Sequence, residues 1–220
     1  MQIKEILQLT PEGQSIVVKG WVKTKRGQAN IIFININDGS TLKNIQAVVE
    51  NGKISEDVLK LATTGAAVAV TGTLVASAGA GQTVEVIAED LVIYGPADET
   101  FPIQPKKHTL EFLREKAHLR FRTNVFGAIF RIRHTLAYAV HKFYHEQGFF
   151  YLHTPIITAS DAEGAGEMFH VSTFAPNKAP LTPEGEIDFS QDFFGRETAL
   201  TVSGQLEGEL AAMALGSIYT

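Results

Sequence analysis

The first part of the chain is patterned as short, half-buried strands. Alternation of apolar and polar positions predicts five strands, over 15–22, 30–36, 44–49, 67–75 and 84–93. Segments 37–40 and 79–82 are rich in turn-forming residues. A short helix is expected from Ser55 to Ala62, with Ser55 as N-cap and with Val58 and Leu61 on one side. Three strands, a helix and two strands form the order of an all-β OB-fold barrel, which we expect over residues 1–100.

The pattern changes after the last of these strands. Segment 101–105 contains two prolines and predicts an interdomain linker, which we place at 101–121. Apolar residues three and four apart then predict a long amphipathic helix from Arg122 to Gln147, ended by Gly148. A face this wide fits packing against a sheet or burial on two sides at a dimer interface. Its residues are Val125, Ile129, Ile132, Leu136, Val140 and Phe143, widened by Phe126, Phe130 and Tyr144.

The last part of the chain predicts further short elements. Segment 149–157 fits a strand interrupted by Pro155, which is typical of an edge or an interface. A strand over 199–202 is expected to enter a helix over 206–215. Between them, the polar segment 177–191 contains prolines and glycine and predicts a mobile insertion, for which we have no chemical role.

Composition is ordinary for a globular protein, with 45% hydrophobic and 20% charged residues among 220. There is no cysteine, so disulfides and thiolate sites are excluded, and we assign no metal ligands. No run approaches the roughly 20 apolar residues of a membrane span, and the first residues are too polar for a secretory signal. We therefore expect a cytoplasmic location and no membrane partner.

The net charge of −5 argues against a generally basic nucleic-acid wrapper, but the cations are unevenly placed. Lys19, Lys23, Lys25 and Arg26 lie close together early in the chain. A second basic group includes 106–108, Arg114, Lys116, Arg120 and Arg122. This second group fits either a linker with a solvated helix face or a nucleic-acid contact.

The second and third strands hold candidate nucleic-acid contacts, because OB-folds bind oligonucleotides on that face through aromatics and cations. Phe33 fits either a base-stacking position or the core. The carboxamide of Gln46 both donates and accepts, which suits an unpaired base edge. Arg26 offers a charge and hydrogen bonds nearby. Gln46 and Arg26 also fit solvated strand positions.

A loop over 158–167 carries three carboxylates among small residues. Gly164 and Gly166 permit close approach of the backbone to a ligand, while Glu163 and Glu167 offer negative charge. The loop therefore fits a site for a cationic group, or a polar surface turn with solvated acids.

Segment 148–157, at the end of the long helix, resembles motif 1 of the class II aminoacyl-tRNA synthetases. The barrel, with segments 20–22 and 36–40, resembles the anticodon-binding domain of their aspartate, asparagine and lysine subgroup. Within it, segments 160–169 and 201–209 are similar to bacterial asparaginyl members. The resemblance covers the whole chain. It implies that 122–220 form the first part of an α+β catalytic domain, with an antiparallel sheet and flanking helices.

The resemblance implies roles for the barrel residues. Phe33 matches the position that stacks on an anticodon base, Gln46 the one that reads the middle uridine, and Arg26 an adjacent anticodon contact. The implied partner is asparagine tRNA.

The resemblance also implies an amino-acid site. Glu163 matches the carboxylate that a mobile lid offers to the α-ammonium group, a charge-assisted contact that lid closure would strengthen. Ser203 and Gln205 match polar residues of the pocket, where glutamine suits the α-ammonium as an acceptor. The other lid residues are Ser160, Asp161, Gly164, Gly166 and Glu167, of which Glu167 is expected only to orient the loop.

Amino-acid specificity depends on two neighbouring positions. Aspartyl relatives carry a lysine where this chain has Gly208, so a neutral substrate side chain is favoured. Glu209 is suited to accept from an asparagine amide and to repel aspartate. Glu209 also fits a solvated helix acid.

The resemblance implies a homodimer through motif 1, with Ile129, Leu136, Phe143 and Pro155 at the interface. It also implies ATP and Mg²⁺ for a two-step reaction through an aminoacyl-adenylate. The chain stops at 217–220, where motif 2 should begin, and motif 3 is absent. We therefore assign no catalytic or ATP-binding arginine, and expect an N-terminal portion that makes no adenylate by itself.

Two other functions remain open. One is a module from a synthetase paralogue, which binds tRNA or another single strand through the barrel. The other is an asparagine-making or aspartyl-type relative on the same fold.

Overall fold

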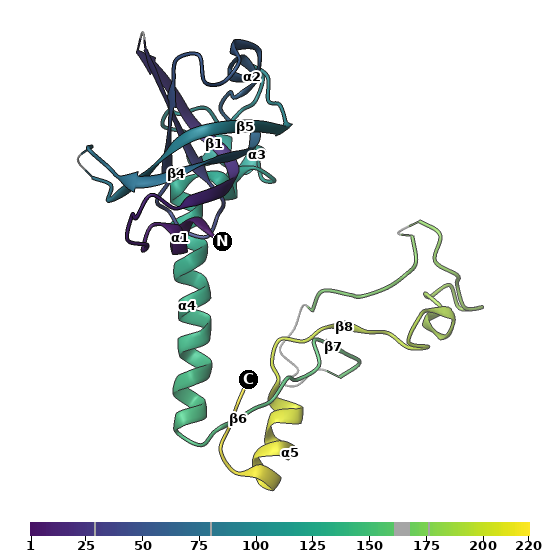
Figure 1. Cartoon of the computed structure of the whole chain (residues 1–220). Coiled ribbons are helices and arrows are strands. Elements are labelled where there is room, and N and C mark those ends of the chain that lie inside the picture. The colour runs from purple at the N-terminus through teal and green to yellow at the C-terminus, as the bar shows by residue number, and fades with distance from the viewer. Residues whose placement is uncertain (29, 80, 161–167, 176) are drawn as a thin grey trace. The chain divides into compact units, whose positions relative to one another are not determined.

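The computed structural model describes residues 1–28, 30–79, 81–160, 168–175 and 177–220 (Figure 1). The chain forms two compact units, Met1–Arg133 and His134–Thr220. The division lies inside the long helix α4 (Asn124–Glu146). The predicted domain boundaries at residues 100 and 121 stay predictions.

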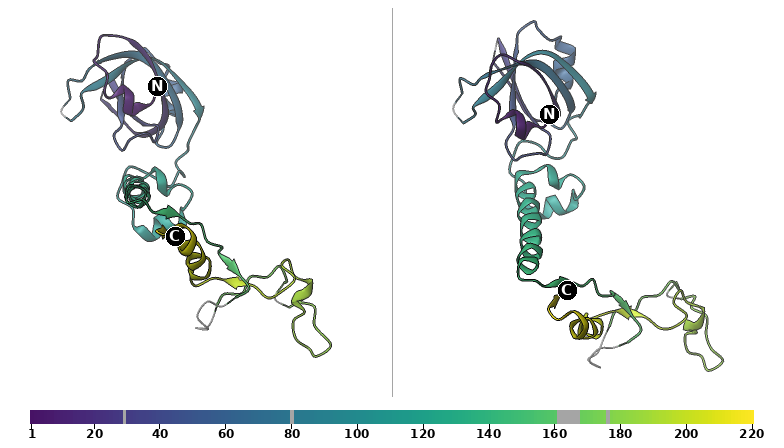
Figure 2. Two further views of the ribbon diagram at one scale, coloured as in Figure 1. Left: turned by 90° about the horizontal axis from the view of Figure 1, so that it is seen from below. Right: turned by 60° about the horizontal axis from the view of Figure 1, so that its bottom comes forward.

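Five strands of the first unit close into a barrel in the order β1-β2-β3-β5-β4 (Figure 2). Neighbouring strands are antiparallel, except that β3 and β5 pair in parallel at Ala47↔Val86 and Val48↔Ile87. The expected OB-fold barrel is confirmed. Its strands are β1 (Ser15–Gln28), β2 (Ile31–Asn37), β3 (Ile45–Glu50), β4 (Ala67–Ala76) and β5 (Val84–Gly95).

The strand β1 is longer than its pattern predicts, since it continues to Gln28 instead of ending at Val22. Its first part, 15–21, pairs with β4, and its second part pairs with β2 as far as Gln28↔Ile31. The second part is polar, which hides it from an apolar periodicity. One long strand therefore serves both neighbours.

A short helix, α1 (Ile3–Ile6), contributes Ile3 and Ile6 to the barrel core. The pattern does not predict it. The Asp38 carboxylate accepts from the Ile3 amide at 2.8 Å and from the Ser40 hydroxyl at 2.6 Å. Burial alone would raise the pKa of Asp38, but these hydrogen bonds lower it. The turn after β2 thus holds the start of the chain on the barrel.

The helix α2 (Glu56–Leu61) confirms the Ser55 cap, because the Ser55 hydroxyl accepts from the Val58 amide at 3.4 Å. Of the two residues expected on one side of this helix, Val58 and Leu61, only Val58 packs on the core. Leu61 is 48% exposed, whereas Val58 and Leu59 pack on the core beside buried Ala62. The helix therefore packs on the barrel through the neighbouring residues Val58 and Leu59, and not through Val58 and Leu61.

The segment expected as an irregular linker is ordered on the barrel. It holds α3 (Leu110–Glu115) and a 3-10 turn, η1 (Arg120–Arg122). The Phe101 ring packs on Gly65, where an added Cβ would lie 2.6 Å from the ring. Ile103 and Leu113 are buried. These contacts supply the order that the two prolines alone do not predict.

The long helix α4 agrees with its predicted span to within two residues at each end, and Gly148 follows it with φ +80°. Most of its apolar face is exposed. Among the helices of the described residues, none combines the length and apolarity needed to cross a bilayer.

After the second part of α4, the second unit contains two short two-stranded sheets. β6 (Phe150–Tyr151) pairs in parallel with β9 (Ile218–Tyr219), and β7 (Ile157–Thr158) pairs antiparallel with β8 (Ala199–Leu200). Pro155 separates β6 from β7, so the expected strand over 149–157 is two strands. The strand expected over 199–202 ends at Leu200, and α5 (Gln205–Leu215) follows it.

The polar insertion over 177–191 has local structure in its described part. A bridge joins Leu181 and Ile187, and η2 (Phe189–Gln191) is capped by Asp188, whose carboxylate accepts from the Ser190 amide. These hydrogen bonds depend on polar side chains and give no apolar periodicity, so the sequence pattern does not predict them. The mobility expected for the insertion stays a prediction.

The Asp192 carboxylate links residues that flank this insertion on its two sides. It accepts from the Thr173 hydroxyl at 2.6 Å, from the Thr173 amide at 3.0 Å and from the Phe193 amide at 2.8 Å. Hydroxyl groups of Ser172 and Thr173 hold the pKa of Asp192 well below its usual value. The carboxylate therefore joins residues nearly 20 positions apart.

Candidate functional site

Arg26 and Phe33 form the first pair of the candidate nucleic-acid site. They are opposite each other in the register of β1 and β2. Ile34 and Ile36 point into the core, so Phe33 lies on the outer face, where it is half-buried. The Arg26 guanidinium carbon is 5.2 Å from the centre of the Phe33 ring. The alternative that Phe33 belongs to the core is wrong.

Gln46 lies beside this pair and is only 6% exposed, so the alternative of a solvated position is wrong for it. Its Oε1 accepts from Nη2 of Arg26 at 3.1 Å. Its Nε2 donates to Oε2 of Glu85 at 3.2 Å. The three predicted anticodon residues are therefore brought together, and the Gln46 amide is oriented by a cation on one side and a carboxylate on the other.

Glu85 is a site residue that the sequence did not indicate. It also accepts from the Ser77 hydroxyl at 3.0 Å and from the Gln82 amide at 3.1 Å. Glu85 reaches Gln46 because β3 and β5 close the barrel in parallel. The only signal in the sequence is a polar position in an alternating strand, which does not distinguish Glu85 from other such positions.

This cluster offers the groups that an unpaired base requires. Phe33 presents part of a ring face, and Arg26 adds an exposed cation. Each amide atom of Gln46 keeps one further hydrogen-bonding position, a lone pair on Oε1 and a hydrogen on Nε2. A base can therefore stack and pair within the same small area.

The candidate amino-acid residues of α5 are also brought together. The Ser203 hydroxyl accepts from the Gln205 amide N–H at 3.1 Å. The side chain of Gln205 donates from Nε2 to Oε1 of Glu209 at 2.8 Å. Glu209 is exposed, so its other oxygen is accessible. Two polar side chains of the first turns of α5 and one from the residue before its N-cap are thus close together.

Two glycines shape this helix start. An added Cβ on Gly204 would lie 2.4 Å from the Thr154 hydroxyl, so a larger residue does not fit without movement. Gly208 is buried, and an added Cβ would lie 3.7 Å from the Ile218 side chain. A long side chain at position 208 would have to pass Ile218.

The predicted lid is described only at its beginning. Ser160 is exposed, and its amide donates to the Thr158 hydroxyl at 3.0 Å. The other predicted lid residues lie outside the described residues. These are Asp161, Glu163, Gly164, Gly166 and Glu167.

The predicted dimer residues are exposed in the single chain. Ile129, Leu136 and Phe143 of α4 are 40%, 60% and 59% exposed, and Pro155 is exposed as well. Apolar side chains at this exposure leave an apolar surface open to solvent.

The described residues contain no cluster of acidic and histidine side chains that would hold a metal ion by themselves. Among them, no group of three His, Asp or Glu side chains lies close enough to hold a metal ion. Hard cations require several oxygen ligands. We therefore assign no described residue to Mg²⁺ or to the phosphates of ATP.

The barrel and the rest of the chain match two protein families. Residues 16–94 match the OB-fold nucleic acid binding domain, and residues 109–220 match the tRNA synthetases class II (D, K and N). An asparagine–tRNA ligase of Porphyromonas gingivalis is 59% identical over 94% of this chain and 45% of its own length. One of Cytophaga hutchinsonii is 55% identical over 100% of this chain and 48% of its own.

Two solved structures are similar in fold over almost the whole chain. An asparaginyl-tRNA synthetase from Pyrococcus horikoshii, complexed with asparaginyl-adenylate, has a TM-score of 0.78 and 25% identity, covering 99% of this chain and 46% of that one. One from Entamoeba histolytica has a TM-score of 0.75 and 20% identity, covering 96% and 45%, and supports the fold alone. The chain spans about half the length of the curated relatives it matches. It belongs to the class II tRNA synthetases of the D, K and N group.

Proposed function

We propose that the protein containing this chain joins asparagine to asparagine tRNA, and that the chain contributes anticodon binding, part of the amino-acid pocket and a dimer interface. The observation that carries the proposal is the cluster of Arg26, Phe33, Gln46 and Glu85 on the outer face of the barrel. It is supported by relatives named asparagine–tRNA ligase at 54–59% identity.

In this proposal the anticodon is read by stacking and by one amide edge. A base stacks on Phe33, which contributes about 1–3 kcal/mol in comparable sites. The donor and acceptor of Gln46 pair with the acceptor and donor of uracil, while cytosine presents a different order of groups. Glu85 and Arg26 hold the amide in one orientation, so the pairing edge is set before RNA binds.

The amino acid is held by side chains at the start of α5. Because Nε2 of Gln205 donates to Glu209, the Gln205 oxygen remains as an acceptor for the α-ammonium group. Glu209 accepts from the substrate amide and disfavours a second carboxylate. Glu163 is assigned as a further acceptor for the α-ammonium group, because it matches the lid carboxylate of the family. We assign these residues to binding and selection, and none of them to the chemical step.

Two copies of the chain associate through α4 and the following residues. In the dimer, apolar contacts would replace the solvent around the side chains of Ile129, Leu136, Phe143 and Pro155. Burial of such side chains provides about 25 cal/mol per Å² of apolar surface.

One experiment tests the proposal against its alternatives. The chain is fused to the segments that complete the Porphyromonas gingivalis relative, and charging of asparagine tRNA is measured with asparagine and with aspartate. Charging with asparagine supports the ligase. RNA binding without charging would favour a binding module, and a preference for aspartate would favour an aspartyl-type relative.

A further inference from the structure

A cavity of about 570 Å³ lies against the barrel, wholly within the first unit. Its walls come from β1, the segment 101–108 and the start of α4, and include Trp21, Lys23 and Phe101. Small-molecule sites commonly enclose about 300–1,000 Å³. The cavity therefore has the size of a ligand site, and none of the residues in the anticodon cluster lines it.

The walls carry positive charge. Lys23, Lys106, Lys107 and Arg122 contribute to them, and none of the described residues that line the cavity is an aspartate or a glutamate. Lys106 and Lys107 are exposed at the rim, whereas Lys23 and Arg122 are half-buried. Burial and the Arg122 charge lower the pKa of Lys23. An anion would relieve the repulsion between these cations.

The Lys23 ammonium can still bind a ligand. It donates to the backbone oxygen of Arg122. An ammonium group has three hydrogens, so this bond leaves donor capacity.

Aromatic rings adjoin the cations. The Arg122 guanidinium carbon lies 4.4 Å from the centre of the Trp21 ring and 6.0 Å from that of Phe101. Flat rings and a guanidinium plane are surfaces on which a nucleobase stacks.

Hydrogen bonds fix the outer wall. Nε2 of Gln104 donates to the Phe101 oxygen at 2.7 Å, and a ring nitrogen of His108 lies 3.0 Å from the Gln104 oxygen. The Phe101 ring is also packed on Gly65. The wall is therefore formed before a ligand arrives, which lowers the ordering cost of binding.

We propose that this cavity binds a free nucleoside phosphate, with the phosphate near Lys23, Lys106 and Lys107 and the base against Trp21, Arg122 and Phe101. A partly open cavity of this size, in which cations adjoin aromatic rings, fits a small aromatic anion better than a continuous strand. The site goes beyond the proposed ligase function, which does not use it.

Trp21 provides a direct probe, because it is the only tryptophan of the chain. The 220-residue chain is titrated with AMP, adenosine, inorganic phosphate and a single-stranded oligonucleotide, with tryptophan emission and calorimetry as readouts. AMP should bind saturably, and adenosine and phosphate at least about tenfold more weakly. No heat and no emission change with AMP would overturn the proposal. Equal binding of phosphate, or binding of the oligonucleotide alone, would also overturn it.

Removal of the lysine charges at the rim of the cavity tests whether AMP binds there. Lys106→Ala with Lys107→Ala should raise the dissociation constant of AMP at least about fivefold. Both side chains are exposed, so the fold should not depend on them. Lys53→Ala, at an exposed turn of the same unit, is the matched control and should leave the constant unchanged. Equal AMP affinity in the double variant and the control would contradict the proposed site.

Discussion

Gln205 donates a hydrogen bond of 2.8 Å from Nε2 to Oε1 of Glu209, one turn further along α5. Two side chains expected to contact different parts of an amino acid therefore contact each other. The bond decides which end of the Gln205 amide faces outward, since Glu209 accepts only from its nitrogen. In the proposed pocket, Glu209 would act through Gln205 as well as through its own charge.

Glu209→Gln should weaken asparagine activation and reduce the rejection of aspartate. The neutral side chain no longer fixes the Gln205 amide and no longer repels a carboxylate, so kcat/KM for asparagine should fall about tenfold or more. Asparagine- and aspartate-dependent pyrophosphate exchange in the fused enzyme measures both effects. Glu207→Gln, on the same helix, is the control. An unchanged ratio between the two substrates would remove Glu209 from the specificity site.

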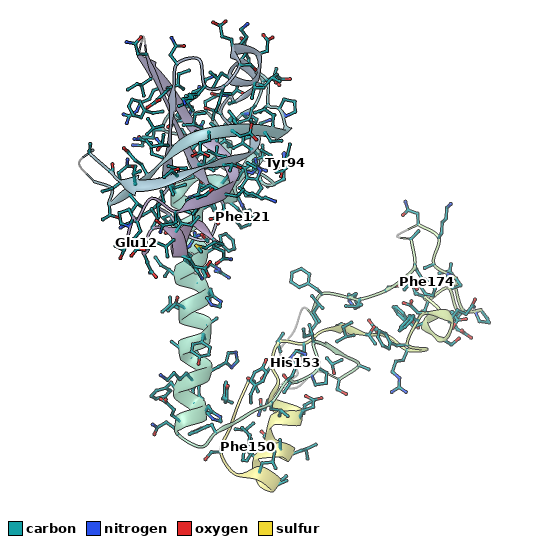
Figure 3. All side chains as sticks on the ribbon, viewed as in Figure 1. Glu12, Tyr94, Phe121, Phe150, His153 and Phe174 are labelled. Atoms are coloured by element: carbon teal, nitrogen blue, oxygen red, sulfur yellow. The ribbon has the colours of Figure 1, made fainter. Side chains whose placement is uncertain are left out.

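Phe33→Ala should weaken binding of asparagine tRNA to the chain. Loss of one stacked base corresponds to about 1–3 kcal/mol, or roughly a fivefold to 150-fold rise in the dissociation constant. Tyr94→Ala removes another exposed aromatic of the barrel, labelled in Figure 3, and should have little effect. Filter binding or fluorescence anisotropy measures the constants. Equal constants for the two variants would contradict base stacking on Phe33.

Glu85→Gln should lower discrimination at the base read by Gln46 more than it lowers total affinity. A neutral amide at position 85 can donate as well as accept, so it no longer dictates the orientation of Gln46. We expect the ratio of affinities for tRNA with uridine and with cytosine at the middle position to fall about tenfold, or about 1.4 kcal/mol. Glu89→Gln, an exposed acid on the same strand, is the control. A uniform loss for both tRNAs would indicate a general electrostatic role instead.

The chain should dimerise in a concentration-dependent way, and Leu136→Glu should shift it to the monomer. A charge at the proposed interface would have to be desolvated without a partner. Analytical ultracentrifugation gives the distribution, and Lys142→Gln on the same helix serves as control. A monomer at every concentration for the unaltered chain would count against an α4 interface.

Low pH should weaken the hydrogen bonds that the Asp192 carboxylate accepts from Thr173 and Phe193. The folded-state pKa of Asp192 is depressed, so its stabilisation is present above the usual value of 3.8 and is lost as the pH falls below it toward the folded-state pKa. Asp192→Asn should therefore reduce the hydrogen-exchange protection of the Thr173 and Phe193 amides at pH 7. The difference from the unaltered chain should shrink in strong acid. A difference that persists there would show that the charge is not the cause.

The barrel could be predicted because each strand alternates and turn residues separate the strands. The residues that meet where β3 pairs with β5 could not be predicted, since the hydrogen bond between Gln46 and Glu85 connects residues 39 positions apart. Ser203 lies just before α5, and Gln205 and Glu209 are four residues apart on it, so their proximity was predictable. The pairing of Gln205 with Glu209 required side-chain geometry. The strands of the second unit are two residues long, which is too short for a periodicity to define their ends.

The parallel seam between β3 and β5 lies next to the residues proposed to read the base. The backbones of β3 and β5 pair at Ala47↔Val86 and Val48↔Ile87, whereas β4 and β5 pair along most of their length. The Gln46–Glu85 hydrogen bond crosses this seam just beyond the last backbone pair. RNA that tightens this bond would also tighten the barrel. We therefore expect the barrel to become more rigid between β3 and β5 when it binds the anticodon.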